Sequence, residues 1–167
     1  MNWLSALKKY EAKITALLRN LIAFFFFLIL VLVTLLVIFR RTGQEFSGGY
    51  ELLTFLFIYT TSIGAAVSVG QKDHISISIF LDMLKNPLKK IVTILNYILI
   101  AFINSVMIFY SVRWIRDVGN FESPVLRIPM KYIQIIIPIG CFFAILYALY
   151  LVVLEIPGSS AEEGEKL

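Results

Sequence analysis

The chain has 167 residues and a formal net charge of +4; 59% of its residues are hydrophobic and 16% are charged. This apolar share exceeds the roughly 45 to 50% of soluble domains, so the composition predicts a membrane protein. One cysteine excludes an intrachain disulfide, and one histidine excludes a pair of axial haem ligands within the chain. Because the sequence has neither a phosphate-binding glycine loop nor metal-ligand spacing, we expect no catalytic residue, metal or cofactor.

Four long intervals lack Asp, Glu, Lys and Arg, and each has the length of one membrane crossing. A hydrocarbon core of about 30 Å needs about 20 residues of α-helix. The sequence therefore predicts an all-α integral membrane domain over 20–154 and a polar, disordered tail over 155–167. The predicted spans are about 20–39, 52–71, 91–112 and 132–154.

The segment before the first span, residues 1–19, is predicted to form an amphipathic interfacial helix. Five apolar residues recur at spacings of four, three, four and three and so share one helical face: Trp3, Leu7, Tyr10, Ile14 and Leu17. Lys8, Lys9 and Lys13 lie off that face. Such a helix lies flat in the headgroup region of a bilayer, or it docks on a partner.

The second span is poor in large side chains at its centre. Thr60, Gly64 and Ser68 recur every four residues, a spacing that lets the backbones of membrane helices approach closely. We interpret this pattern chiefly as packing between helices of the chain itself. Contact with a partner subunit is the alternative.

The loop after the second span is predicted to contain a short interfacial helix that ends before Pro87. Ile75 to Ile79 alternate with serines as in a strand, but an isolated strand at a membrane surface has no pairing partner. A helical stripe over the same region favours the helix: Ile75, Ile79, Phe80, Met83 and Leu84. For His74, beside Asp73, we favour a surface hydrogen bond over a proton relay.

The third span contains two amides, Asn96 and Asn104, which lie two turns apart and so on nearly the same face. An amide in hydrocarbon seeks a hydrogen-bonding partner, and such interhelical bonds contribute roughly 0.6 to 2 kcal/mol. We therefore expect both to face protein, with a structural bond favoured over a polar substrate path. In the fourth span, Pro138 frees the carbonyl of Gln134 and is predicted to kink the helix.

The distribution of positive charge predicts the orientation. Nine of the 15 lysines and arginines lie before the first span, between spans two and three or in the tail, and six lie in the other two loops. By the positive-inside rule both termini are cytoplasmic. Because the charge flanks the membrane instead of forming a basic domain, we expect contact with membrane lipids and no nucleic-acid partner.

Several blocks of the sequence resemble one transporter family. Glu51 opens the second span, the run IGAAVSVGQKDHISI follows at 63–77, and SPVLRIPMKYIQIIIPIG stands at 123–140. Over residues 20 to 153 the chain resembles the small membrane subunit, the Q component, of tripartite ATP-independent periplasmic (TRAP) transporters. It departs from the family pattern at Ser78, where an acid is common, and at Lys131, where an aromatic residue is common.

The resemblance implies a non-catalytic subunit in the bacterial inner membrane. Its partners would be a large multi-span permease subunit, which moves substrate and sodium by an elevator motion, and a periplasmic protein that delivers an organic acid such as a dicarboxylate or a sialic acid. The chain would act as a fixed scaffold. Candidates for helix packing and for contact with the large subunit are Glu51, Thr60, Gly64, Ser68, Asn96 and Asn104. Candidate contacts with the binding protein are Arg40, Arg41, Arg113, Arg116 and Arg127, for which contact with lipid headgroups is the alternative.

Two other functions compete with this hypothesis. An independent four-helix exporter usually carries a glutamate in its first span, whereas this first span is uncharged. A membrane anchor for a respiratory enzyme is disfavoured by the single histidine. An autonomous ion-coupled carrier normally has an ionisable group within a span, and none of the four predicted spans contains one.

Overall fold

The structure, a computed structural model, describes residues 2–43, 46–71 and 86–155, and its long elements are all α-helices. They are α1 (Asn2–Arg41), α2 (Gly49–Gly70), α4 (Asn86–Val118), the short α5 (Lys131–Gln134) and α6 (Ile136–Glu155). Within these residues four segments are long and apolar enough to cross a membrane, with α5 and α6 forming the last one together. The predicted all-α architecture, with four helices long and apolar enough to span a membrane, is confirmed.

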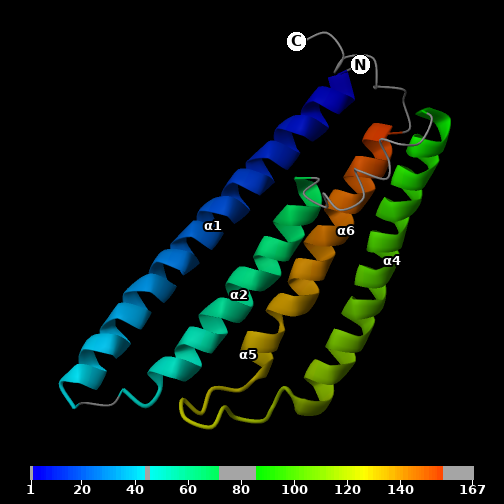
Figure 1. Cartoon of the computed structure of the whole chain (residues 1–167). Coiled ribbons are helices and arrows are strands. Elements are labelled where there is room, and N and C mark those ends of the chain that lie inside the picture. Colours follow the sequence, from blue (N-terminus) through cyan, green and yellow to red (C-terminus); the bar gives the residue numbers. More distant parts are fainter. Residues whose placement is uncertain (1, 44–45, 72–85, 156–167) are drawn as a thin grey trace.

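The four long helices form a row one helix thick, in the order α1, α2, α6, α4 (Figure 1). Consecutive spans run in opposite directions, so the turns after α1 and after α4 lie at one end. The start of α1 and the end of α6 lie at the other. Because α2 and α6 each have a neighbour on both sides, a far larger share of their residues is buried than in α1 and α4. The core of the protein is therefore the α2–α6 interface.

Small residues bring α2 and α6 close together. Ala66 on α2 and Ala148 on α6 are 1% and 0% exposed. A β-carbon added at Gly140 would lie 2.8 Å from the carbonyl oxygen of Ser62 and would also meet the hydroxyl of that residue. Since lipid removes the hydrophobic drive between membrane helices, this close backbone approach supplies the van der Waals contact that holds the pair together.

The fourth span is interrupted where Pro138 predicts a kink. The helix breaks at Ile135, between α5 and α6. Proline has no N–H to donate to the carbonyl four residues before it, so the helix loses a bond here. Two hydroxyls of α2 bind carbonyls beside the break: Tyr59 donates to the carbonyl of Tyr132, and Ser62 donates to that of Ile136 at 2.9 Å. The interruption is thus fastened to α2.

The expected interfacial helix over 1–19 is not supported as a separate element. From Asn2 to Arg41 the chain forms one uninterrupted helix of 40 residues, about 60 Å long. The reason is local, because the first glycine of the sequence is Gly43 and the first proline is Pro87. The part of the apolar stripe from Leu7 to Leu17 is exposed, with Leu17 at 69%.

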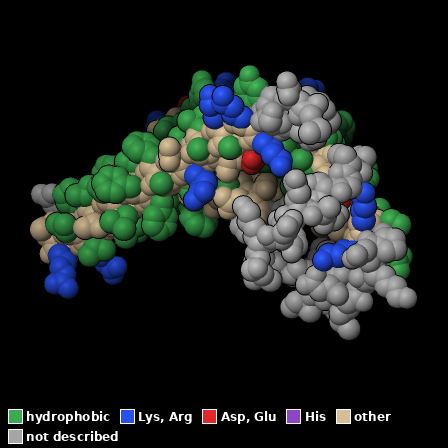
Figure 2. Space-filling view, turned by 90° about the horizontal axis from the view of Figure 1, so that it is seen from above, with side chains coloured by type: hydrophobic (Ala, Val, Ile, Leu, Met, Phe, Trp, Pro, Cys, Tyr) green, Lys and Arg blue, Asp and Glu red, His purple; other side chains and the backbone are tan. Residues whose placement is uncertain are grey.

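A different face of α1 binds the bundle. Thr15 donates a hydrogen bond to the carboxylate of Glu11 at 2.8 Å, and its hydroxyl lies 2.8 Å from that of Tyr147 on α6. A hydroxyl has one proton to donate, so Tyr147 is the donor to Thr15. Leu18, one turn further on, is buried in the core cluster. In the view from above, hydrophobic side chains cover the long arm that α1 forms, with basic side chains at its tip (Figure 2).

Two predicted features lie outside the described residues. The short helix expected after the second span, with His74, falls within 72–85, and nearly all of the predicted tail falls within 156–167. α4 begins at Asn86, so Pro87 lies in its first turn, where a missing N–H costs no helical bond. α4 extends beyond the predicted span 91–112 at both ends.

Gly140 and Gly64 offer a matched test of helix packing. Gly140→Ala should force α2 and α6 apart and destabilise the fold by about 1–3 kcal/mol, the usual cost of overpacking. Gly64→Ala should not, because nothing lies within 4 Å of the added β-carbon. Both variants gain the same helix propensity, so a difference between their unfolding midpoints in detergent reports packing alone. Equal midpoints would contradict the α2–α6 contact described above.

Candidate functional site

Glu51, in the first turn of α2, holds the loop that joins α4 to α5. Its carboxylate Oε2 accepts hydrogen bonds from the backbone N–H groups of Val125, at 3.2 Å, and Leu126, at 2.7 Å. A carboxylate is favoured in the first turn of a helix by the helix dipole, and bonds to a charged acceptor are stronger than neutral ones. Two blocks some 75 residues apart in sequence therefore meet through one side chain.

The loop has a fixed shape of its own, which we call the Ser123 turn (residues 121–130). Ser123 is 2% exposed, and its hydroxyl accepts the N–H of Ile128 at 3.1 Å. Its own N–H donates to the carbonyl of Ile128 at 2.9 Å, and Met130 N–H donates to Phe121 at 2.9 Å. These bonds close the turn on itself, so the carboxylate of Glu51 binds a preformed structure.

Arg127 is the one non-glycine residue with positive φ, 52°, among the described residues. This left-handed conformation is costly for a side chain with a β-carbon. Here Ser123 maintains it, because its carbonyl accepts the N–H of Arg127 and its hydroxyl accepts the N–H of Ile128. The turn therefore presents an exposed arginine on a rigid support, together with the exposed side chains of Phe121 and Val125. Rigid display of charge and apolar surface is typical of a contact site for another protein.

The five candidate arginines lie at one end of the molecule, but they do not form one cluster. Arg40 and Arg41 end α1, while Arg113 and Arg116 lie in the last turns of α4. α1 and α4 are the two edges of the row, so the two pairs lie on opposite sides, with Arg127 in the loop that leaves α4 (Figure 1). All five are exposed.

The structure does not bring the candidate residues for helix packing together. Nδ2 of Asn104 donates to the carbonyl of Ile100 on its own helix at 2.8 Å, and Thr60 likewise donates to Leu56 at 2.8 Å. Neither is part of an interhelical bond within the described chain. No atom of another element lies within 4 Å of the position a β-carbon would take at Gly64. The interpretation of this small-residue spacing as packing within the chain therefore does not hold at Gly64, and Gly140 makes the close approach instead.

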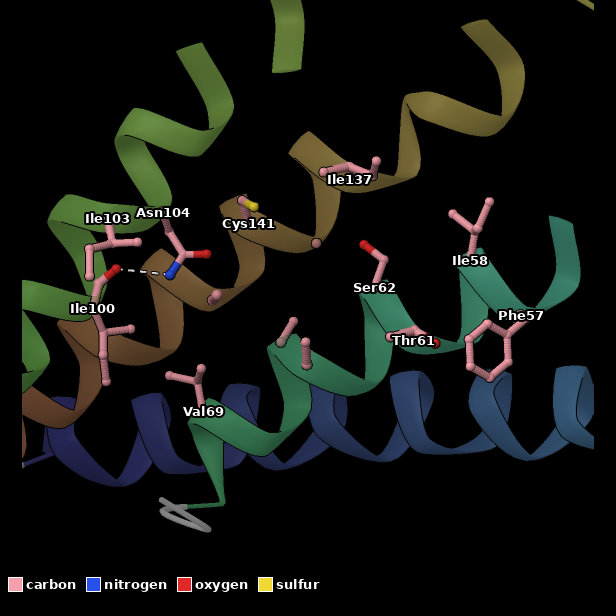
Figure 3. A pocket seen from close by; sticks show the side chains of 14 residues that line it. Phe57, Ile58, Thr61, Ser62, Val69, Ile100, Ile103, Asn104, Ile137 and Cys141 are labelled. Carbon is pink, nitrogen blue, oxygen red and sulfur yellow. Dashed lines mark hydrogen bonds between the residues drawn. The ribbon is translucent and has the colours of Figure 1, made fainter. Parts of the chain in front are cut away.

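A groove runs between α2 and α4 with α6 as its floor (Figure 3). It has a volume of about 540 Å³ and is lined mostly by apolar side chains. Small residues line it, among them Ala65, Ala66, Gly140 and Ala144, and Cys141 lies on the floor. Phe57 stands on the α2 side, and Ile103 and Asn104 stand on the α4 side.

The polar contacts that hold the spans together were not predicted from the sequence. Tyr59, Ser62 and Tyr147 all use hydroxyls to bind another element. The available signal was a hydroxyl within an apolar span, but many such hydroxyls bond only to their own helix, as Thr60 does. Gln134 is 4% exposed, and its Oε1 has no hydrogen-bonding partner within the described residues.

The polar side chains of this site, Glu51 and Ser123, form hydrogen bonds to N–H groups of the loop backbone. Among the described residues, no three His, Cys, Asp or Glu side chains lie together in a way that would hold a metal ion. What the arrangement does is fix a loop, through Glu51 and Ser123, at the end of a row of apolar helices.

A model of one protein family, described as the DctQ component of tripartite ATP-independent periplasmic transporters, matches residues 29–158, more than three quarters of the chain. The chain belongs to this family. It is therefore a small membrane component of a TRAP transporter, a class of transport protein, and a multi-pass membrane protein. No curated protein matches the chain. The matched segment of this DctQ protein contains both Glu51 and the Ser123 turn.

Neutralising Glu51 should loosen the Ser123 turn. In Glu51→Gln the amide offers a neutral acceptor, so the bonds to Val125 and Leu126 weaken by about 1 kcal/mol. We expect backbone amides at 125 and 126 to exchange with deuterium roughly five- to tenfold faster. Glu122→Gln is the matched control, since Glu122 is an exposed acid of the same loop. Unchanged exchange in Glu51→Gln, or equal acceleration in both variants, would show that the carboxylate does not hold the loop.

Proposed function

We propose that this DctQ protein is a non-catalytic scaffold for the large, elevator-type permease subunit of its transporter. The observation that carries the proposal is the row of helices. In the order α1, α2, α6, α4, each helix contacts only its neighbours along most of its length, so the described helices surround no path across the membrane. A row of this kind offers broad apolar faces for other helices, and that suits a wall against which a second subunit packs.

Hydrogen bonds near the loop between α4 and α5 also support a scaffold role. A scaffold for an elevator motion has to keep its shape while the moving domain slides past it. The carboxylate of Glu51 links the start of α2 to the loop before α5, and Ser62 links α2 to α6 beside the proline break. These bonds resist shear between neighbouring spans.

The orientation follows from charge. Both termini lie in the cytoplasm, and the turn after α1 and the Ser123 turn face the periplasm, with the chain in the bacterial inner membrane. The arginines at the periplasmic end, Arg40, Arg41, Arg113, Arg116 and Arg127, then attract an acidic surface of the substrate-binding protein. Charges at the rim of an interface mainly set the association rate and the orientation of the partner. The transported substrate is an organic acid, a dicarboxylate or a sialic acid, taken up together with sodium.

Reconstitution tests the scaffold role. Proteoliposomes that contain only this chain should not accumulate an organic acid, whereas co-expression with the large subunit should give a stable complex that takes up the acid when sodium and the loaded binding protein are added. Uptake by the chain alone would overturn the proposal, as would failure of the two subunits to co-purify.

The same assay tests the arginines. At a saturating concentration of substrate, the rate at low concentrations of binding protein should fall as salt rises, because screening shortens the reach of exposed charges to about 8–10 Å near physiological ionic strength. A combined Arg116→Glu and Arg127→Glu variant should be slower at low salt and less dependent on salt. A variant with the salt dependence of the unmodified complex would exclude these residues from docking.

A further inference from the structure

The groove between α2, α6 and α4 has the form of a receptor for a helix. Its floor consists of small side chains on α6 and the adjoining face of α2, including Gly140, Ala144 and Ala66. Larger side chains line its two sides, among them Phe57 on α2 and Ile103 on α4 (Figure 3). Small residues at the bottom of such a groove let the backbone of an incoming helix approach closely, which is how membrane helices gain contact.

Polar groups within the groove distinguish a protein occupant from a lipid. The one hydrogen bond that Asn104 makes within the described chain uses its Nδ2, with the carbonyl of Ile100 as acceptor. Its Oδ1 points from α4 out over α6 in Figure 3 and accepts no bond from the described residues. Thr61, exposed on α2, also places its hydroxyl at the groove.

A second amide, Asn96, lies on the same helix as Asn104. Asn96 precedes Ile103 by seven residues, two turns, and so lies on the groove side of α4. It makes no interhelical bond within the described chain either. The sequence thus places two carboxamides on one face of α4, and Asn104 is the one of the two that lines the groove. An acyl chain has no donor for a carboxamide oxygen, whereas a helix with a serine, threonine, asparagine, glutamine or tryptophan side chain has one.

We infer that a transmembrane helix of the large permease subunit lies in this groove, with a polar side chain that donates a hydrogen bond to Oδ1 of Asn104. The inference rests on the proposed function and makes it specific, since it assigns the α2–α6–α4 face of the row to the partner. The outer side of α4, which carries Phe102, then faces lipid.

Photo-crosslinking in the assembled complex tests the inference. p-Benzoylphenylalanine replaces Phe57, in the groove, or Phe102, outside it; the two phenylalanines are 63% and 65% exposed in the isolated chain. We expect position 57 to form an adduct with the large subunit and position 102 to form adducts with lipid. Adducts of position 57 with lipid alone or with a second copy of the chain, or equal adducts with the large subunit from both positions, would overturn the inference. Because the complex is purified first, these results leave the proposed function standing; failure of the complex to form would count against that function instead.

A second pair of variants tests the hydrogen bond. Asn104→Leu keeps the branched shape of the side chain and removes the amide. Ser105→Ala is the control: the hydroxyl of Ser105 donates to the carbonyl of Ala101 on its own helix at 2.8 Å, and the residue is exposed and lies outside the groove. Asn104→Leu should lower the recovery of complex about fivefold and leave the unfolding midpoint of the isolated chain unchanged. Ser105→Ala should change neither. Normal recovery of the Asn104→Leu complex, or loss of stability in the isolated chain that accounts for the deficit, would contradict the proposed bond.

Discussion

The close approach of α2 and α6 determines how the rest of the protein is arranged. Without a β-carbon at Gly140, the backbone of α6 reaches the carbonyl of Ser62, and the hydroxyl of Ser62 can bind the carbonyl of Ile136 beside the break in the last span. Since this pair occupies the middle of the row, α1 is left to pack on α2 and α4 to pack on α6. The groove follows from the same arrangement, because two flanking helices stand on either side of a floor made of small residues.

Glu51 fixes the loop between α4 and α5 to the start of α2. The glutamate and the SPVLR segment belong to the two blocks that make the sequence resemble the DctQ family, and the structure joins them by two hydrogen bonds. One consequence is that the loop carrying Arg127 is fixed to the start of α2. Under the proposed scaffold role, a contact made on this loop by the binding protein would be transmitted to the helix row, and the fixed loop would keep that docking surface in place while the large subunit moves.

The spans could be predicted from the sequence because the bilayer excludes charge. Runs without acids or bases have to be about 20 residues long to cross it, and such runs indicate all four helices. Which side of each helix contacts another helix could not be predicted in the same way. In a uniformly apolar helix every side can face lipid, so the steric fit between two helices decides which side contacts protein. The regular spacing of small residues around Gly64 does not reveal which helix, if any, fits against that side. The interfacial helix over 1–19 failed for a related reason, since amphipathic periodicity describes a surface and does not say where a helix ends. The sequence of α1 has no residue that would end it before Gly43.

In the proposed scaffold role, this chain stays rigid while its partner moves. Spin labels on Arg41→Cys, at the end of α1, and Arg113→Cys, near the end of α4, mark the two edges of the row; Cys141→Ala removes the native thiol from the labelling reaction. The distance distribution between the labels is measured by pulsed electron paramagnetic resonance in the reconstituted complex, with and without sodium and the loaded binding protein. A rigid scaffold gives one distribution that stays the same under both conditions. A shift larger than the width of that distribution would show that the row itself moves during transport, and would rule out a rigid scaffold.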